Sequence, residues 1–74
     1  MSVQVNKGGS VEFLISPNTG YTITLVIIDD VIVSSDNYTL ADGTKVSLTG
    51  TMTDLYVTFS NIQGNHSLYA SFAR

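Results

Sequence analysis

Apolar and polar residues alternate along most of this 74-residue chain, as in Val11 to Ile15 and Leu55 to Phe59. A period of two places successive side chains on opposite faces of a β-strand. No stretch of useful length has apolar residues at the spacing of an amphipathic helix. The pattern therefore predicts an all-β chain of six to eight short strands.

Turn-forming residues separate the alternating runs. Pro-Asn-Thr-Gly at residues 17–20 and Asp-Gly at residues 42–43 supply the backbone angles that tight turns need. Asp29 and Asp30 lie between two β-branched runs, and a type I′ turn there would place Asp30 at positive φ. Hairpins imply antiparallel pairing. We therefore expect a small antiparallel sandwich or a flattened open barrel of hairpin-linked strands, with a β-grasp-like fold as the alternative.

Two apolar strand faces must meet to exclude water, and this requirement selects the predicted core. On the outer side of the same strands, Tyr56 and Tyr69 are expected to point away from the core and to be neighbours if their strands pair. The predicted core consists of Val11, Phe13, Ile15, Ile23, Leu25, Ile27, Val57, Phe59, Ile62, Leu68, Ala70 and Phe72.

Length and composition exclude several classes of protein. A chain of this size, residues 1–74, forms a single domain that buries roughly 60% of its surface, so we expect no room for a large buried active-site pocket. The absence of cysteine excludes disulfides, zinc–thiolate sites and thiol nucleophiles. A net charge of −3 argues against nucleic acid, and the longest apolar run, Leu25 to Ile28, is too short to span a membrane.

The inventory of reactive side chains is small. His66, the only histidine, is interpreted as a turn or strand-start residue, because the chain has no Gly-x-Ser-x-Gly motif to present a nucleophile. Asp29 and Asp30, with Asp36 or a carbonyl, are candidate Ca²⁺ ligands, but adjacent carboxylates diverge in a turn, so a solvated hairpin is the favoured interpretation. No catalytic residue, cofactor or metal site is predicted.

Aromatic side chains are the candidate ligand contacts. Tyr56 and Tyr69 on outward-facing strand positions resemble the platforms on which sugar rings stack. The same positions are favourable for ordinary packing in a half-buried sheet, and the chain has no tryptophan. Ordinary packing is therefore the favoured interpretation, with Tyr56 and Tyr69 kept as possible contacts.

Two segments resemble a known family. Residues 9–23 read GSV-x-F-x-ISPN-x-GY-x-I, residues 26–29 continue with V-x-ID, and residues 56–72 read Y-x-x-F-x-NI-x-x-NHSL-x-A-x-F. In order and spacing they are similar to the two halves of a bacterial extracellular repeat, the divergent relative of the internalin-type B-repeat. The similarity covers residues 5–30 and 56–72. The chain departs from that pattern at Asp30, where the family usually has Gly, and in residues 33–55, where an added hairpin is expected. The upstream strand that usually begins such a repeat is absent.

The resemblance implies a non-catalytic spacer or interaction module of a bacterial secreted or cell-surface protein, and the chain would then be a fragment of a longer precursor. Its partners would be neighbouring domains of the same polypeptide, with a surface protein or a glycan as further candidates, and neither nucleic acid nor membrane insertion is expected. The first alternative is a carbohydrate- or peptide-binding module. The second is a self-assembling phage or pilus subunit, which would pair through the apolar runs Leu25–Ile28 and Val31–Val33.

Overall fold

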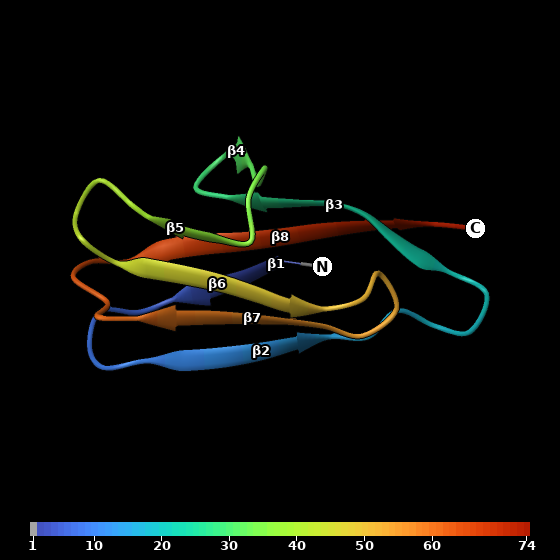
Figure 1. The fold of residues 1–74 in the computed structure, drawn as a ribbon, viewed down its shortest axis with the longest axis horizontal. Helices are drawn as coiled ribbons and strands as arrows, with labels where there is room; N and C mark the ends of the chain where they lie inside the picture. Colours follow the sequence, from blue (N-terminus) through green and yellow to red (C-terminus); the bar gives the residue numbers. More distant parts are fainter. Residues whose placement is uncertain (1) are drawn as a thin grey trace.

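The computed structural model describes residues 2–74 and folds them into a β-sandwich of two four-stranded antiparallel sheets (Figure 1). One sheet has the order β1-β8-β3-β4 and the other β2-β7-β6-β5. No helix occurs in the described range, which confirms the all-β prediction and excludes the β-grasp-like alternative. The strands are β1 (Ser2–Val5), β2 (Val11–Ile15), β3 (Thr22–Ile28), β4 (Val31–Ile32), β5 (Asn37–Thr39), β6 (Lys45–Gly50), β7 (Leu55–Ser60) and β8 (His66–Ala73).

Hairpins join β3 to β4, β5 to β6 and β6 to β7, whereas the remaining connections cross from one sheet to the other. In the β3–β4 turn both central residues have positive φ, 52° at Asp29 and 64° at Asp30. Two positive φ values are the mark of a type I′ turn, whose twist matches that of the flanking strands. The β5–β6 pair is the added hairpin expected within residues 33–55.

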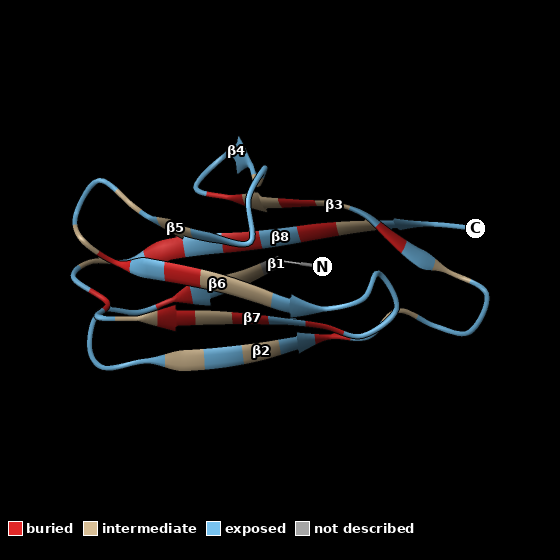
Figure 2. Ribbon diagram, viewed as in Figure 1, coloured by how far each residue is buried: buried red, intermediate tan, exposed pale blue. Residues whose placement is uncertain are grey.

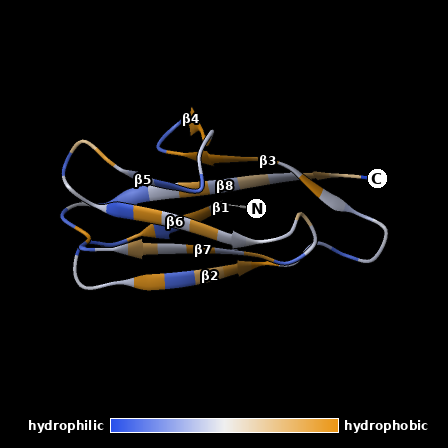
Figure 3. Cartoon of the chain, in the orientation of Figure 1, coloured by the Kyte–Doolittle hydropathy of each residue, from blue (hydrophilic) through white to orange (hydrophobic). Residues whose placement is uncertain are grey.

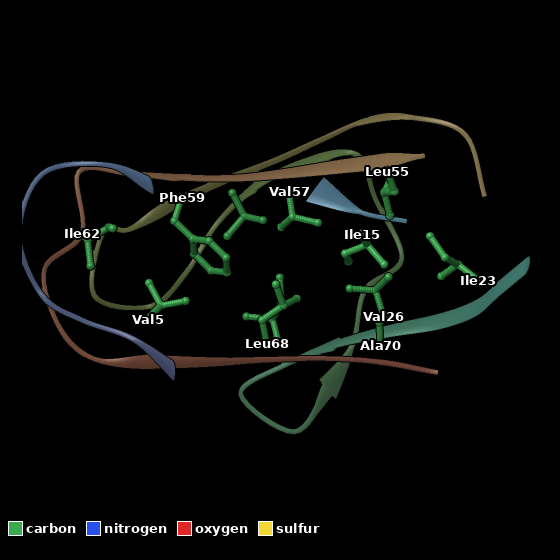
Figure 4. Packing of buried hydrophobic residues seen from close by; sticks show 12 residues of the cluster. Val5, Ile15, Ile23, Val26, Leu55, Val57, Phe59, Ile62, Leu68 and Ala70 are labelled. Carbon is green, nitrogen blue, oxygen red and sulfur yellow. The ribbon is translucent and has the colours of Figure 1, made fainter. Parts of the chain in front are cut away.

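Side chains from both sheets fill the space between the layers (Figure 4). Phe59 is fully buried in this core and meets Phe13 edge to face with ring centroids 6.2 Å apart. Seven of the predicted core residues are buried: Ile15, Ile23, Val57, Phe59, Ile62, Leu68 and Ala70.

The prediction for β3 was wrong in its second half. Leu25 and Ile27 are only half-buried, and Val26 and Ile28 are buried in their place. The pairing of β3 with β8 shifts register between Ile23 and Leu25, which marks a β-bulge. An extra residue in one strand exchanges its inward and outward positions, so strict alternation from Ile23 assigned the wrong face.

Three further members of the predicted core lie at its margin. Val11 and Phe13 are half-buried because β2 is an edge strand whose far side has no neighbour. Phe72 is 36% exposed, because it lies near the end of β8, opposite Ile23 and away from the centre of the second sheet. Burial at these positions follows the distance from the middle of the sandwich more than the phase of the strand.

The first and last strands are neighbours, and this fixes where the chain ends point. β1 pairs with β8 in antiparallel fashion, with Ser2 opposite Tyr69 and Val5 opposite His66. The start of β1 and the end of β8 are therefore both directed toward the end of the sandwich where Ala73 pairs with Thr22. Within residues 2–74 the structure has no helix that is long and apolar enough to cross a membrane.

Candidate functional site

A pocket of about 610 Å³ opens at one end of the sandwich, between the β3–β4 hairpin and the segment that carries β5. Its polar residues include Asp29, Asp42 and His66. The hollow lies between two hairpins at the surface, whereas the expectation from the chain length concerned a large pocket buried within the core. The apolar walls of the hollow comprise Ile28, Val31, Ile32, Val33, Tyr38 and Leu40.

The hairpin that forms one wall is apolar and open to solvent. Val31 and Ile32 on β4 are 66% and 63% exposed, and β4 is coloured as exposed in Figure 2 and as hydrophobic in Figure 3. β4 is an edge strand that pairs with only the last two residues of β3. An exposed apolar edge of this kind is a common feature of surfaces that contact another molecule.

His66 lies beneath the pocket and joins two turns that are distant in the sequence. It is the first residue of β8, as the sequence predicted for a strand-start residue, and its side chain is largely buried. Its Nδ1 hydrogen-bonds Asp29 Oδ2 in the β3–β4 turn, and its Nε2 lies 2.9 Å from Asp42 Oδ2 in the β5–β6 turn. One imidazole therefore connects a hairpin of each sheet.

Both carboxylates are fixed by backbone donors as well. The Ser67 N–H donates to Asp29 Oδ1 at 2.9 Å, so the β3–β4 turn is held against the start of β8. The Thr44 N–H donates to Asp42 Oδ1 at 2.9 Å, the Asx-turn geometry that an Asp-Gly sequence favours. Gly43 between them has φ of 96°, which a glycine adopts without strain.

Thr44 is the fourth member of a polar cluster that also contains Asp29, Asp42 and His66. Its side chain has no exposed surface, and its Oγ1 accepts the Gln63 N–H at 3.0 Å while lying 3.2 Å from His66 Nε2. The hydroxyl thus links the β5–β6 turn to the segment that leads into β8. Within the described residues no buried side-chain nitrogen or oxygen lacks a partner.

The geometry determines the charge of His66. Each ring nitrogen faces a carboxylate oxygen, and only the doubly protonated imidazolium has an N–H for both. Burial lowers the pKa of His66, but the hydrogen bonds that its ring N–H groups donate to Asp29 and Asp42, together with the negative charges of these carboxylates, outweigh that effect, so the pKa is raised. The pKa of Asp42 is lowered, first by the Thr44 backbone N–H and further by the hydrogen bonds to Thr44 and His66.

Asp29, His66 and Thr44 formally resemble an acid–base–nucleophile triad, with the carboxylate on one ring nitrogen and the hydroxyl on the other. Two features separate the cluster from a working triad. Thr44 is 0% exposed, so its oxygen is not accessible to a substrate, and Asp42 occupies the nitrogen that would take the proton of the hydroxyl. The arrangement is suited to joining two hairpins and to holding a fixed set of charges beneath the pocket.

The two candidate tyrosines do not form a common platform. Tyr56 and Tyr69 are 41% and 45% exposed, so both point away from the core as predicted. However, Tyr56 is on β7 and Tyr69 on β8, which belong to different sheets. Their side chains therefore extend from opposite faces of the sandwich, and because β7 and β8 do not pair, the condition under which the two tyrosines would be neighbours is not met.

Asp29 and Asp30 form the hairpin turn that the sequence predicted. The carboxylate of Asp29 is directed at His66 and Ser67, while Asp30 and Asp36 are exposed. In residues 2–74 no group of three acidic, histidine or cysteine side chains is arranged to hold a metal ion.

Sequence reasoning missed the association of His66 with Asp42 and Thr44. These residues are separated by 24 and 22 positions from His66, and each was assigned only to its local turn or strand. No local pattern in the sequence brings them together, because the contact depends on how two hairpins from different sheets meet. Comparisons of the chain with protein-family models, with curated proteins and with solved structures find no match.

Proposed function

We propose that this chain is a non-catalytic interaction module, or a spacer that also makes contacts, in a bacterial secreted or cell-surface protein. The observation that carries the proposal is the position of the pocket relative to the chain ends. The pocket lies where β3 ends and β8 begins, whereas the end of β8 is seven residues further along, a distance of about 23 Å at the usual rise of a strand.

This separation favours display of the pocket. Any chain that continued beyond β1 or β8 would leave toward the end where Thr22 pairs with Ala73. A tether there would leave the pocket and the exposed β4 edge free to meet a partner. The bacterial extracellular setting rests on the resemblance of residues 9–23 and 56–72 to the repeat family.

The polar cluster supports a non-catalytic role. Asp29 and Asp42 hold the imidazole of His66 from both sides, and the nearest hydroxyl, that of Thr44, is enclosed. A general base needs a free ring nitrogen, and a nucleophile needs access to its substrate. An activity abolished by His66→Ala, with the fold retained, would overturn this part of the proposal.

Peptide and glycan arrays provide the test. Wild-type protein is compared with Ile32→Ser, which alters an exposed pocket residue, and with Tyr56→Ala and Tyr69→Ala on the two outer faces. We expect binding to peptide spots that is lost in Ile32→Ser and retained in both tyrosine variants. Glycan binding lost in either tyrosine variant would support the carbohydrate-binding alternative instead, and absence of all binding would contradict an interaction role.

A self-assembling structural subunit is the second candidate, and the exposure of Val31 and Ile32 on the edge strand β4 favours it. Two copies joined edge to edge would extend the sheet and cover these side chains. Sedimentation velocity over a range of protein concentrations separates the possibilities. A species that remains monomeric at high concentration excludes self-pairing through β4.

A further inference from the structure

The pocket has a net negative charge, because its two carboxylates are compensated only in part by His66. Asp29 and Asp42 contribute to its lining, and within the described chain no lysine or arginine does so. With His66 as imidazolium, the three charged groups sum to −1. A ligand entering the pocket therefore meets a site with net negative charge.

Both carboxylates keep unused accepting capacity. Asp29 receives hydrogen bonds from His66 and Ser67, and Asp42 receives them from His66 and from both the backbone and the side chain of Thr44. A carboxylate offers about four lone-pair positions, so roughly half of the capacity of Asp29 and about a quarter of that of Asp42 remain. The side chains of Asp29 and Asp42 are 39% and 33% exposed, which leaves that capacity accessible.

The remainder of the lining is apolar and includes one aromatic ring. Ile32 and Leu40 offer aliphatic surface, and the half-buried Tyr38 presents a ring whose face attracts cations. Burial, with a contribution from the charge of Asp29, raises the pKa of Tyr38, so its phenol is neutral at physiological pH. Apolar walls, an aromatic ring and free carboxylate lone pairs together match a side chain with an aliphatic stem and a cationic head.

We propose that this pocket binds a lysine or arginine side chain of a partner protein, with the aliphatic stem against Ile32 and Leu40 and the cationic head at Asp29 and Asp42. This inference rests on the proposed interaction role and names its ligand chemistry. A purely apolar side chain would cover the two carboxylates without offering them a donor, which costs free energy. An acidic side chain would be repelled by the net charge.

The test is an NMR titration of the ¹⁵N-labelled protein with four pentapeptides that differ only in the central residue. Acetylated and amidated Gly-Gly-X-Gly-Gly carries lysine, arginine, norleucine or glutamate at X, and norleucine keeps an aliphatic stem without the charge. We expect lysine and arginine peptides to shift the amide signals of Asp29, Asp42 and Ser67. Their affinity should exceed that of the norleucine peptide by about threefold to tenfold, the range expected of a partly exposed ion pair with a cation–π contact.

Matched variants separate the contribution of the pocket's carboxylates to binding from that of its apolar wall. Asp42→Asn removes one pocket charge and should abolish the preference for lysine over norleucine, while Glu12→Gln on the remote strand β2 makes the same charge change and should leave it intact. Ile32→Ser should weaken lysine and norleucine peptides alike, and because Ile32 is largely exposed this variant folds even if Asp42→Asn does not.

Equal binding of lysine and norleucine peptides, shifts centred outside the pocket, or no shifts at millimolar peptide would each overturn the inference. The outcome is separable from that of the proposed function. A pocket-dependent partner found on the arrays whose bound segment contains neither lysine nor arginine would preserve the interaction role while removing this inference.

Discussion

At the scale of single residues, the structure is organised around His66. A charge that is buried alone is costly, but this imidazolium donates to two carboxylates that are themselves held by backbone N–H groups. The group is therefore both a connection between hairpins and the source of the charge pattern beneath the pocket. Two predictions belong to this scale.

The first concerns pH. The pKa of His66 is raised in the fold, so its contribution to stability is fully present below its ordinary pKa of about 6.5 and is lost as pH rises through the raised value. The pKa of Asp42 is lowered, so its contribution is present above about pH 3.9 and is lost as pH falls through the lowered value. We expect the free energy of unfolding, measured in urea, to be highest between about pH 4 and 6.5.

A control variant isolates the histidine. His66→Asn removes the titrating group, so the decrease in unfolding free energy above about pH 6.5 should disappear even though the variant is less stable overall. A decrease of the same slope in His66→Asn would show that another group is responsible.

The second prediction concerns the enclosed hydroxyl of Thr44. Thr44→Val keeps the shape but removes the acceptor of the Gln63 N–H, and the expected loss is about 1–3 kcal/mol of unfolding free energy. Thr44→Ser keeps the hydroxyl and removes one methyl group, for a loss of about 1 kcal/mol. Urea denaturation of both variants should show valine to be the more damaging substitution, and the reverse order would contradict the role of the hydroxyl.

At the scale of elements, β3 and the turn after it determine how the pocket is built. The bulge between Ile23 and Leu25 turns Val26 and Ile28 inward, and Ile28 then leads directly into the type I′ turn that carries Asp29. Because the turn is short, the carboxylate of Asp29 is held against His66 with little conformational freedom. Strand phase and turn type therefore act together in placing one side of the site.

A substitution at Asp30 changes this turn without replacing a residue of the polar cluster around His66. The Asp30 φ of 64° is strained for most residues and natural for glycine. We expect Asp30→Gly to raise the free energy of unfolding by about 0.5–1 kcal/mol. Asp30→Val, with a β-branched side chain at positive φ, should lower it by about 1–3 kcal/mol. Thermal denaturation measures both, and a stabilising valine would contradict the turn assignment.

At the scale of the whole molecule, a buried core fills the space between the two sheets, and the pocket opens at one end of the sandwich. Phe59 on β7 and Leu68 on β8 come from different sheets, and both are fully buried in the core between them. Val31 and Ile32 on β4 are exposed at the pocket (Figure 2). The antiparallel pairing of β1 with β8 directs the chain ends away from that pocket. The pocket and the end of β8 therefore lie at opposite ends of one closed core.

Two phenylalanines of identical size test the extent of this core. Phe59 has no exposed surface, so Phe59→Ala should cost about 3–5 kcal/mol of unfolding free energy. Phe72 is 36% exposed, and Phe72→Ala should cost about 1–2 kcal/mol because fewer contacts are lost and water already reaches the site. Equal losses in urea denaturation would indicate that Phe72 belongs to the core after all.

The sequence by itself determined the strand period, the turns and the central part of the core, because these depend on neighbours along the chain. Residues such as Phe59 and Leu68 were assigned correctly from alternation, and the Asp42-Gly43 turn from its residue types. Only the tertiary structure decided the phase of β3 after its bulge, since that shift is set by the pairing with β8. It also decided that His66 meets Asp42, because the start of β8 and the β5–β6 turn belong to different sheets and no local pattern brings them together.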